Sequence, residues 1–206
     1  MGLGETLRAY QKNDPAARSK LEIFLLYNGL HATLYYRAAH WLYRRHCKFL
    51  ARWLSQHAKW TTGVEIHPAA TIGRRLVIDH GTGIVIGATT EIGDDCLLYQ
   101  GVTLGGTGIA GGKRHPTLGN NVMVGSGAKI LGPITVGDNA RVAANAVVLR
   151  DVPENSTVVG VPGRIVRVNG EKLDHVHTPD PVELEIQELR SRLQALEAEL
   201  AKRKDD

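Results

Sequence analysis

Residues 66–104 read IHPAATIGRRLVIDHGTGIVIGATTEIGDDCLLYQGVTL, and aliphatic residues recur in this stretch every six positions. The frame shifts once by two residues, between Ile84 and Ile86, and resumes at Leu118 after an interruption. Glycine often follows the aliphatic residue, as in Ile72-Gly73. The aliphatic residues in frame are Ile66, Ile72, Ile78, Ile84, Ile86, Ile92, Leu98, Leu104, Leu118, Val124, Ile130, Val136, Val142 and Val148.

A period of six matches neither an α-helix nor an alternating strand. It is typical of a coil with three flat faces of about six residues, in which the aliphatic side chain points inward and glycine helps the backbone to turn. We therefore predict a mainly β fold, a left-handed parallel β-helix built from hexapeptide repeats. An ordinary β-rich domain with Val/Ile strands is the alternative.

The segments on either side have different periods. Residues 1–62 have helical spacing and predict a cap of two to four helices, with Asp14 as the N-cap of one helix and Pro15 at its first position. The β-helix is expected over residues 63–168, with a loop at residues 105–117, and is followed by a polar linker at residues 169–179.

The last segment, residues 180–206, predicts a heptad helix. Its apolar residues follow the 4-3-4-3-4 spacing of a coiled-coil seam. A coiled coil needs partner chains, so the tail favours a homo-oligomer; a single amphipathic helix lying on its own solenoid is the alternative. The seam residues are Val182, Ile186, Leu189, Leu193, Leu196 and Leu200.

Composition narrows the function. The chain has 206 residues and a net charge of +4, and its basic residues are dispersed, which argues against a nucleic-acid partner. Its two cysteines do not indicate a disulfide framework or a Cys-ligated metal. No apolar run is long enough to cross a bilayer and no signal peptide is evident, so we expect a cytoplasmic protein without a membrane partner.

The break in the repeat is the first candidate for chemistry. Residues 105–116 read GGTGIAGGKRHP. A solenoid accommodates an insertion by looping it out at a corner, and exposed loops on a rigid scaffold often carry function. Arg114 and His115 end this loop and are suited to holding an anion and a polar substrate. A flexible loop with incidental basic residues is the alternative.

The second candidate is the pair Asp79-His80. A positioned imidazole can take a proton from a hydroxyl, and a carboxylate that orients it improves this function. Glu65, which we place about two coils upstream, is a candidate partner. No serine or cysteine in these motifs stands out as an acyl carrier, so direct transfer between two bound substrates is the simpler scheme. A solvated corner is the alternative interpretation of the pair.

These motifs resemble serine O-acetyltransferases of the hexapeptide-repeat acyltransferase superfamily, in the short form. The resemblance spans about residues 60–168, half of the chain, and Asp14-Pro15-Ala16 matches as well. The matching stretches are GVEIHPAATIG at 63–73, IDHGTG at 78–83, GVTLGGTG at 101–108, KRHP at 113–116, GSGAKILG at 125–132 and VGVPGR at 159–164.

The resemblance implies transfer of acetyl from acetyl-CoA to the hydroxyl of L-serine, giving O-acetyl-L-serine for cysteine biosynthesis. It implies His80 as general base, Glu65 as its carboxylate partner and His115 as a further catalytic residue. It implies no tightly bound cofactor and no metal, with acetyl-CoA as co-substrate. Serine would be bound by Asp14, Asp79, Arg114 and His115. The CoA groove would be lined by Gly106, Thr107, Ser126, Gly127, Ala128 and Arg141.

The resemblance also implies a homotrimer, because half of each groove would come from the next chain. Glu65 stands where many relatives have aspartate. The helical cap is shorter than the cap that joins two trimers in long-form relatives, so we expect a trimer. The chain ends in Lys204-Asp205-Asp206, without the terminal isoleucine that docks into O-acetylserine sulfhydrylase, so this possible partner is not expected to dock there.

Three other functions remain to be distinguished. An acetyltransferase of the same fold acting on a sugar or antibiotic would differ in its acceptor. A zinc enzyme of the γ-carbonic-anhydrase type would need closely spaced ligands, and His67, His80 and His115 lack that spacing. A non-catalytic scaffold would use the heptad tail to recruit a partner.

Overall fold

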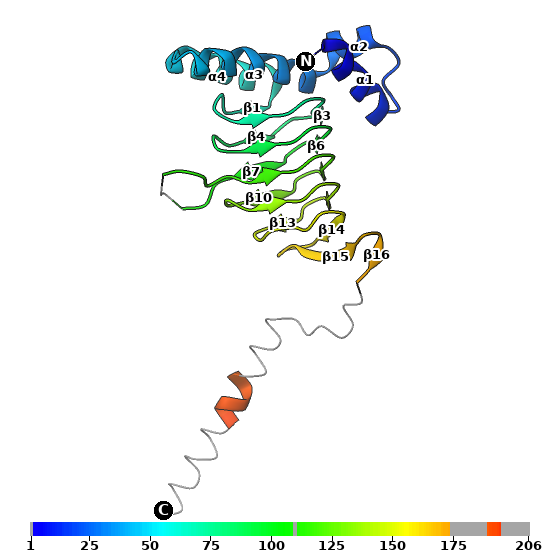
Figure 1. Ribbon diagram of the computed structural model, residues 1–206, viewed down its shortest axis with the longest axis vertical. Helices are drawn as coiled ribbons and strands as arrows, with labels where there is room; N and C mark the ends of the chain where they lie inside the picture. Colours follow the sequence, from blue (N-terminus) through cyan, green and yellow to red (C-terminus); the bar gives the residue numbers. More distant parts are fainter. Residues whose placement is uncertain (1, 109–110, 174–188, 195–206) are drawn as a thin grey trace, which may run out of the picture. The chain divides into compact units, whose positions relative to one another are not determined.

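The computed structural model describes residues 2–108, 111–173 and 189–194, in two units that divide between Lys172 and Leu173. The first unit has an N-terminal helical cap followed by a parallel β-solenoid (Figure 1). The predicted hexapeptide solenoid is confirmed. In the second unit, residues 189–194 are helical. Most of the predicted linker and heptad segment lies outside the described residues, and the coiled coil stays a prediction.

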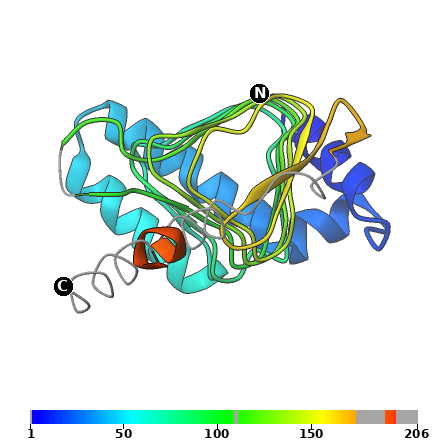
Figure 2. The same cartoon turned by 90° about the horizontal axis from the view of Figure 1, so that it is seen from below.

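The strands form three sheets, one for each face of a triangular coil (Figure 2). From β1 to β13 each sheet takes every third strand, so the coils stack on one another. One sheet consists of β1 (Glu65–Ile66), β4 (Val85–Ile86), β7 (Thr103–Gly105), β10 (Lys129–Leu131) and β13 (Val147–Val148). Its five parallel strands correspond to five coils. We call it the central sheet, because both predicted catalytic motifs flank it.

The other two faces are built in the same way. The second sheet consists of β2 (Thr71–Ile72), β5 (Glu91–Ile92), β8 (Thr117–Leu118) and β11 (Thr135–Val136). The third sheet consists of β3 (Val77–Asp79), β6 (Leu97–Tyr99), β9 (Met123–Val124), β12 (Arg141–Val142), β14 (Ser156–Val159), β15 (Arg164–Val168) and β16 (Glu171–Lys172). In this sheet β15 pairs antiparallel with both β14 and β16.

The in-frame aliphatic residues fill the inside of the coil. Ile78, Leu98, Val124 and Val142 follow one another up the third sheet, and all four are at most 1% exposed. Such stacking buries apolar area continuously along the solenoid, and burying one aliphatic side chain contributes roughly 1.5–3 kcal/mol. The six-residue period therefore records which side chains point inward.

The register of the coils locates both irregularities of the repeat. Val85 pairs with Thr103, an offset of eighteen residues, whereas Glu65 pairs with Val85, an offset of twenty. The two extra residues lie between the ends of β3 and β4, in the corner at residues 80–83. Glu91 pairs with Thr117, an offset of twenty-six, because the β7–β8 connection holds the predicted loop, which projects from one corner (Figure 2).

The cap consists of α1 (Leu3–Asn13), α2 (Lys20–Leu26), α3 (Asn28–Arg44) and α4 (Lys48–Thr62). Helices α3 and α4 lie across the first coil (Figure 1). Small buried residues of α4 face the coil, and Ser55 donates a hydrogen bond of 2.7 Å to the carbonyl of Ile66. Tyr36 of α3 donates to the carbonyl of Ala70 at 2.6 Å. The cap therefore satisfies polar groups of the first coil.

The predicted helix start at Asp14 is wrong. Asp14 is the C-cap of α1, and the next helix, α2, begins after Ser19, whose hydroxyl accepts the N–H of Glu22. The carboxylate of Asp14 instead accepts the N–H of Ala16 in the turn. Asp-Pro is equally suited to a turn and to a helix start, and here the turn prevails.

The contact between α3 and the coil gives a stability test at Gly29. A Cβ there would lie 2.1 Å from the carbonyl oxygen of Ile78. We expect Gly29→Ala to destabilise the fold by roughly 2 kcal/mol in urea unfolding, although alanine favours a helix, because overpacking outweighs helix propensity. Gly4→Ala in α1 is the control, since nothing lies within 4 Å of its Cβ, and it should leave stability unchanged or slightly raised. Equal effects of the two substitutions would contradict this packing.

Candidate active site

The predicted functional residues lie along two edges of the central sheet. The entry edge consists of the corners that lead into its strands, among them residues 80–83, 100–101 and 126–127. The exit edge consists of the corners that follow its strands, among them residues 67–70, 87–90 and the β7–β8 loop. Figure 2 shows this loop leaving the coil at one corner of the triangle.

His80 lies on the entry edge, in the corner with two extra residues. Its backbone φ is 59°, and Gly81 and Gly83 also have positive φ. The wider corner turns the imidazole outward, so that its side chain is 75% exposed. A proton acceptor for a bound hydroxyl needs such access. The two-residue shift of the repeat therefore marks the place where His80 leaves the regular coil, a connection that becomes visible only in the register of the strands.

Two carboxylates lie near this corner, and neither is hydrogen-bonded to His80 in the single chain. Asp79 Oδ1 is 3.9 Å from His80 Nε2, too far for a hydrogen bond. Glu65 Oε2 accepts a hydrogen bond of 2.6 Å from Lys59 at the end of α4.

The prediction that Glu65 lies about two coils before His80 is wrong. Glu65 pairs with Val85, which is one full coil later, and His80 precedes Val85. Glu65 therefore lies less than one coil before His80. The backbones of the two segments are adjacent, since the N–H of Gly83 donates to the carbonyl of Gly63 at 2.9 Å.

Two tyrosines of the cap lie near the entry edge, and one of them binds Asp14. The hydroxyl of Tyr27 donates to Asp14 Oδ2 at 2.5 Å. This hydrogen bond, with smaller contributions from burial and from the charges of Asp14 and Asp79, raises the pKa of Tyr27 to about 12. Tyr10 packs edge-on against Tyr27, and its hydroxyl accepts the N–H of Ile78 at 3.2 Å. The charges of Asp14 and Asp79 thus both act on Tyr27, although 65 positions separate the two carboxylates in the chain.

His115 lies on the exit edge and is only 7% exposed. Its ring packs against Gly87, where a Cβ would lie 1.8 Å from Cδ2 of the imidazole. Nδ1 is 2.8 Å from the hydroxyl of Thr89. Burial, followed by the positive charges of Arg114 and Lys113, lowers the pKa of His115. The ring is therefore fixed and neutral near neutral pH.

Arg114 precedes His115 and keeps its side chain exposed. Its guanidinium makes one long hydrogen bond, 3.5 Å to the carbonyl of Gly108. Lys113 is anchored more firmly, to Glu91 at 2.9 Å and to the carbonyl of Thr89 at 2.8 Å. The base of the loop is thus held, while the Arg114 side chain can meet an anion.

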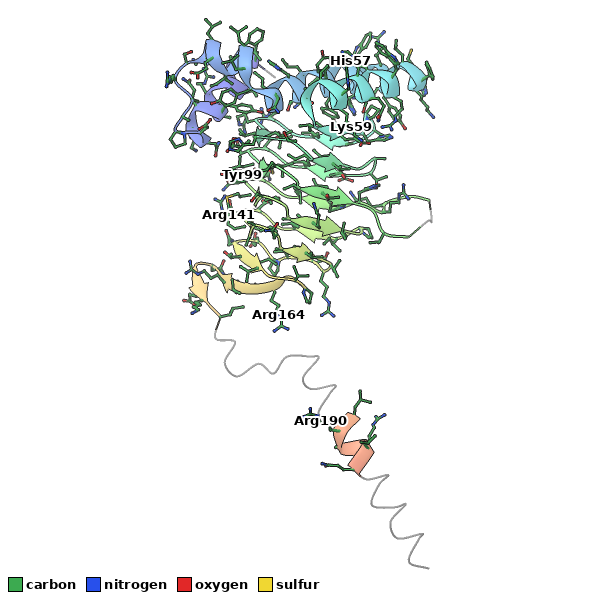
Figure 3. All side chains as sticks on the ribbon, turned by 180° about the vertical axis from the view of Figure 1, so that it is seen from behind. His57, Lys59, Tyr99, Arg141, Arg164 and Arg190 are labelled. Carbon is green, nitrogen blue, oxygen red and sulfur yellow. The ribbon has the colours of Figure 1, made fainter. Side chains whose placement is uncertain are left out.

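The residues predicted for CoA divide between the same two edges. Gly106 and Thr107 lie at the exit edge, and Ser126 and Gly127 at the entry edge. Ala128 is fully buried, so only its backbone can contribute to a groove. Arg141 is exposed on the third sheet, on the same side as Tyr99 and away from the loop (Figure 3).

One chain therefore keeps the two halves of the predicted site apart. His80 lies before β4, and the ring of His115 lies against Gly87, just after β4. The four residue-to-residue steps from Gly83 to Gly87 span roughly 13 Å in extended backbone. A molecule the size of serine does not bridge this distance within one chain.

Sequence reasoning missed three residues of these surroundings: Lys59 beside Glu65, Tyr27 beside Asp14, and Thr89 beside His115. The first two contacts depend on helix packing, which no motif records. Thr89 has a signal, because it precedes His115 by the same twenty-six residues that separate Glu91 from Thr117. No cluster of three or more His, Cys, Asp or Glu that could hold a metal occurs in the described parts of the chain.

Comparison with known proteins identifies the family of the chain. The family model for bacterial transferase hexapeptide (six repeats) matches residues 115–150. Serine acetyltransferases of Bacillus pumilus and Bacillus subtilis are 53% and 52% identical to the chain, over 97% and 98% of its length and 94% and 95% of theirs. The chain belongs to the serine acetyltransferase family. Family membership thus rests on nearly the whole sequence, including the cap.

A solved serine acetyltransferase of Neisseria gonorrhoeae, in complex with serine, has the same fold. It is 42% identical, with a TM-score of 0.78, over 80% of this chain and 67% of the solved chain. The chain thus spans about two thirds of the length of that serine acetyltransferase. No helix in the described residues is long and apolar enough to cross a membrane.

The packing of His115 gives a test of the exit edge. Gly87→Ala would place a methyl group inside the imidazole, so we expect the ring to be displaced and serine acetyltransferase activity to fall at least about tenfold. Gly111→Ala in the loop has nothing within 4 Å of its Cβ and should keep near-normal activity. Normal activity of a folded Gly87→Ala protein would show that this ring position is not needed.

Proposed function

We propose that this chain acetylates the hydroxyl of L-serine directly from acetyl-CoA, at a site shared between two copies of the chain. Serine acetyltransferase activity in cysteine biosynthesis follows from its family. The mechanism and the residues are our proposal. The observation that carries it is the division of the predicted site between the two edges of one sheet.

In the proposed reaction His80 is the general base. Its exposed imidazole accepts the proton of the serine hydroxyl as the oxygen attacks the thioester carbonyl. The tetrahedral intermediate then expels the CoA thiolate, which takes up the proton from the His80 imidazolium. General-base assistance of this kind contributes about 10² to 10⁴ in rate.

Glu65 is the proposed carboxylate partner of His80, since it belongs to the strand that follows Gly63, directly beneath the His80 corner. In this role it would turn from Lys59 toward the imidazole and stabilise its charged form. Lys59 is 51% exposed at its side chain, so the hydrogen bond that must break is partly solvated and costs little.

The two halves of the site become complementary when copies pack around a three-fold axis. If the central sheet of each chain faces the axis, the entry edge of one chain meets the exit edge of the next. His80 would then face Arg114 and His115 of the neighbouring copy. A closed ring of three gives three identical sites and leaves no half-site unused. We therefore propose a homotrimer.

The charges of the two halves suit an amino acid. Asp79 and Asp14, whose charges both act on Tyr27, would offer negative charge to the ammonium group of serine. Arg114 is positive and loosely held, so it can bind the carboxylate in a bidentate way. His115 would contribute a further hydrogen bond. This pairing favours an amino-acid acceptor over a sugar or an antibiotic.

The CoA groove would follow the same seam. Gly106 and Thr107 from one chain would face Ser126 and Gly127 from the next, with Ala128 contributing backbone alone. Arg141 lies further out on the third sheet, where its charge could meet a phosphate group. The terminal residues 204–206 lie outside the described residues, so the expectation that O-acetylserine sulfhydrylase does not dock there stays a prediction.

The base is tested with His80→Asn, since asparagine tolerates the positive φ of this position. We expect the rate of CoA-thiol release from acetyl-CoA and L-serine to fall at least about 10²-fold, because the proton acceptor is lost. His31→Asn in the cap is the control and should retain activity. A His80→Asn protein with more than about a tenth of the normal rate would rule out His80 as the base.

The shared site is tested by mixing two inactive chains, His80→Asn and His115→Asn. Co-expressed chains that assemble at random place an intact entry edge against an intact exit edge in about a quarter of the interfaces. Activity should therefore return to about that fraction, while each variant alone stays inactive. Sedimentation would confirm the trimer. No recovery from mixed trimers would place both residues of a site in one chain.

A further inference from the structure

Thr89 binds the end of the β7–β8 loop through several of its atoms. Its hydroxyl oxygen accepts the backbone N–H groups of Arg114 and His115, each at 3.1 Å. The same hydroxyl lies 2.8 Å from Nδ1 of His115, and the backbone N–H of Thr89 lies 3.3 Å from that nitrogen. Its carbonyl accepts the ammonium group of Lys113 at 2.8 Å. One residue thus organises three consecutive residues of the proposed site.

These contacts determine which imidazole nitrogen of His115 carries the proton. A backbone N–H can only donate, so Nδ1 must accept from Thr89. The Thr89 hydroxyl oxygen already accepts two N–H groups, which leaves its own proton to be donated to Nδ1. The ring proton of neutral His115 therefore lies on Nε2. A second proton on Nδ1 would face two donors, which adds to the burial and positive charges that lower the pKa of His115.

The opposite nitrogen remains available to a ligand. Nε2 lies between Gly87 and Gly106, and within the described residues it makes no hydrogen bond. The buried side-chain atoms without a partner in that part of the chain are Arg37 Nε, Arg52 Nη1 and Thr90 Oγ1. His115 is 7% exposed, so its ring retains a small contact with solvent. It can therefore donate to an oxygen atom that arrives from outside.

We propose that Thr89 is a positioning residue that holds His115 as a neutral Nε2–H donor toward an acceptor oxygen of the substrate. The inference rests on the proposed function, in which His115 belongs to the site. It divides the work of the two histidines: His80 accepts the proton of serine, and His115 donates a hydrogen bond and takes no proton. Thr89 acts through His115 and does not touch the substrate.

The chain offers a matched control for this inference. Thr90 is the adjacent residue, 1% exposed, and its hydroxyl has no hydrogen-bond partner among the described residues. Thr89→Val and Thr90→Val remove the same hydroxyl from neighbouring positions at nearly constant shape. Thr89→Ser keeps the hydroxyl and serves as the conservative rescue.

The first measurement is the tautomer, read from the imidazole nitrogen shifts of ¹⁵N-histidine-labelled full-length protein. His115 is assigned by the signal lost in His115→Asn. We expect wild type, Thr89→Ser and Thr90→Val to show the Nε2–H form, without protonation at pH ~6.5, the ordinary imidazole pKa. Thr89→Val should populate the Nδ1–H form or titrate at higher pH. An Nδ1–H form or an imidazolium in the wild type at neutral pH would overturn the inference, even if Thr89→Val fails to fold.

The second measurement is steady-state kinetics of the same four proteins. Thr89→Val should raise the KM for serine roughly tenfold, the loss of about one hydrogen bond, with a smaller change in kcat. Thr89→Ser and Thr90→Val should stay near wild type. Unchanged kinetics in a Thr89→Val protein with a shifted tautomer would overturn the positioning role. Full activity of His115→Asn would instead refute the proposed role of His115 in the site. The tautomer measurement does not assume that role, so the two proposals can fail separately.

Discussion

The in-register stacking of successive coils is the constraint on which this structure depends. Each strand forms its hydrogen bonds with the coils before and after it. Every coil must therefore place the same kind of side chain at the matching position of its strand. Ile66, Ile86, Leu104 and Ile130 meet this demand along the central sheet. Residues that do not fit the period cannot enter a strand, and they must leave at a corner.

Both departures from the period border the same sheet, and this links the fold to the function. The two extra residues at 80–83 push an imidazole into solvent at the entry edge. The longer insertion before Thr117 carries Arg114 and His115 at the exit edge. A single rigid strand, β4, separates them. The rigidity that positions each half also prevents one chain from closing the site, which makes assembly part of the proposed mechanism.

The two histidines illustrate how environment divides chemical roles. His80 sits in an open corner, where its imidazole is exposed and can reach the hydroxyl of a bound substrate. His115 is buried beside two cations and faces hydrogen-bond donors at Nδ1, where gaining a proton is unfavourable. The same type of side chain thus serves as a base at one position and as a hydrogen-bond donor at the other. The difference depends on what each ring contacts and not on its neighbours in sequence.

The sequence by itself determined the solenoid, its inward residues and the position of the loop at residues 105–117, because a period of six is a direct record of the coil. It also singled out Arg114 and His115, which lie in the longer interruption, and His80, which forms a polar pair with Asp79 within the repeat. The role of Asp14 as a C-cap, the position of Glu65 less than one coil before His80 and the contacts of Thr89 were decided by tertiary structure. Each depends on which residues of different coils or helices come into contact, and a linear period carries no information about contacts between unlike segments.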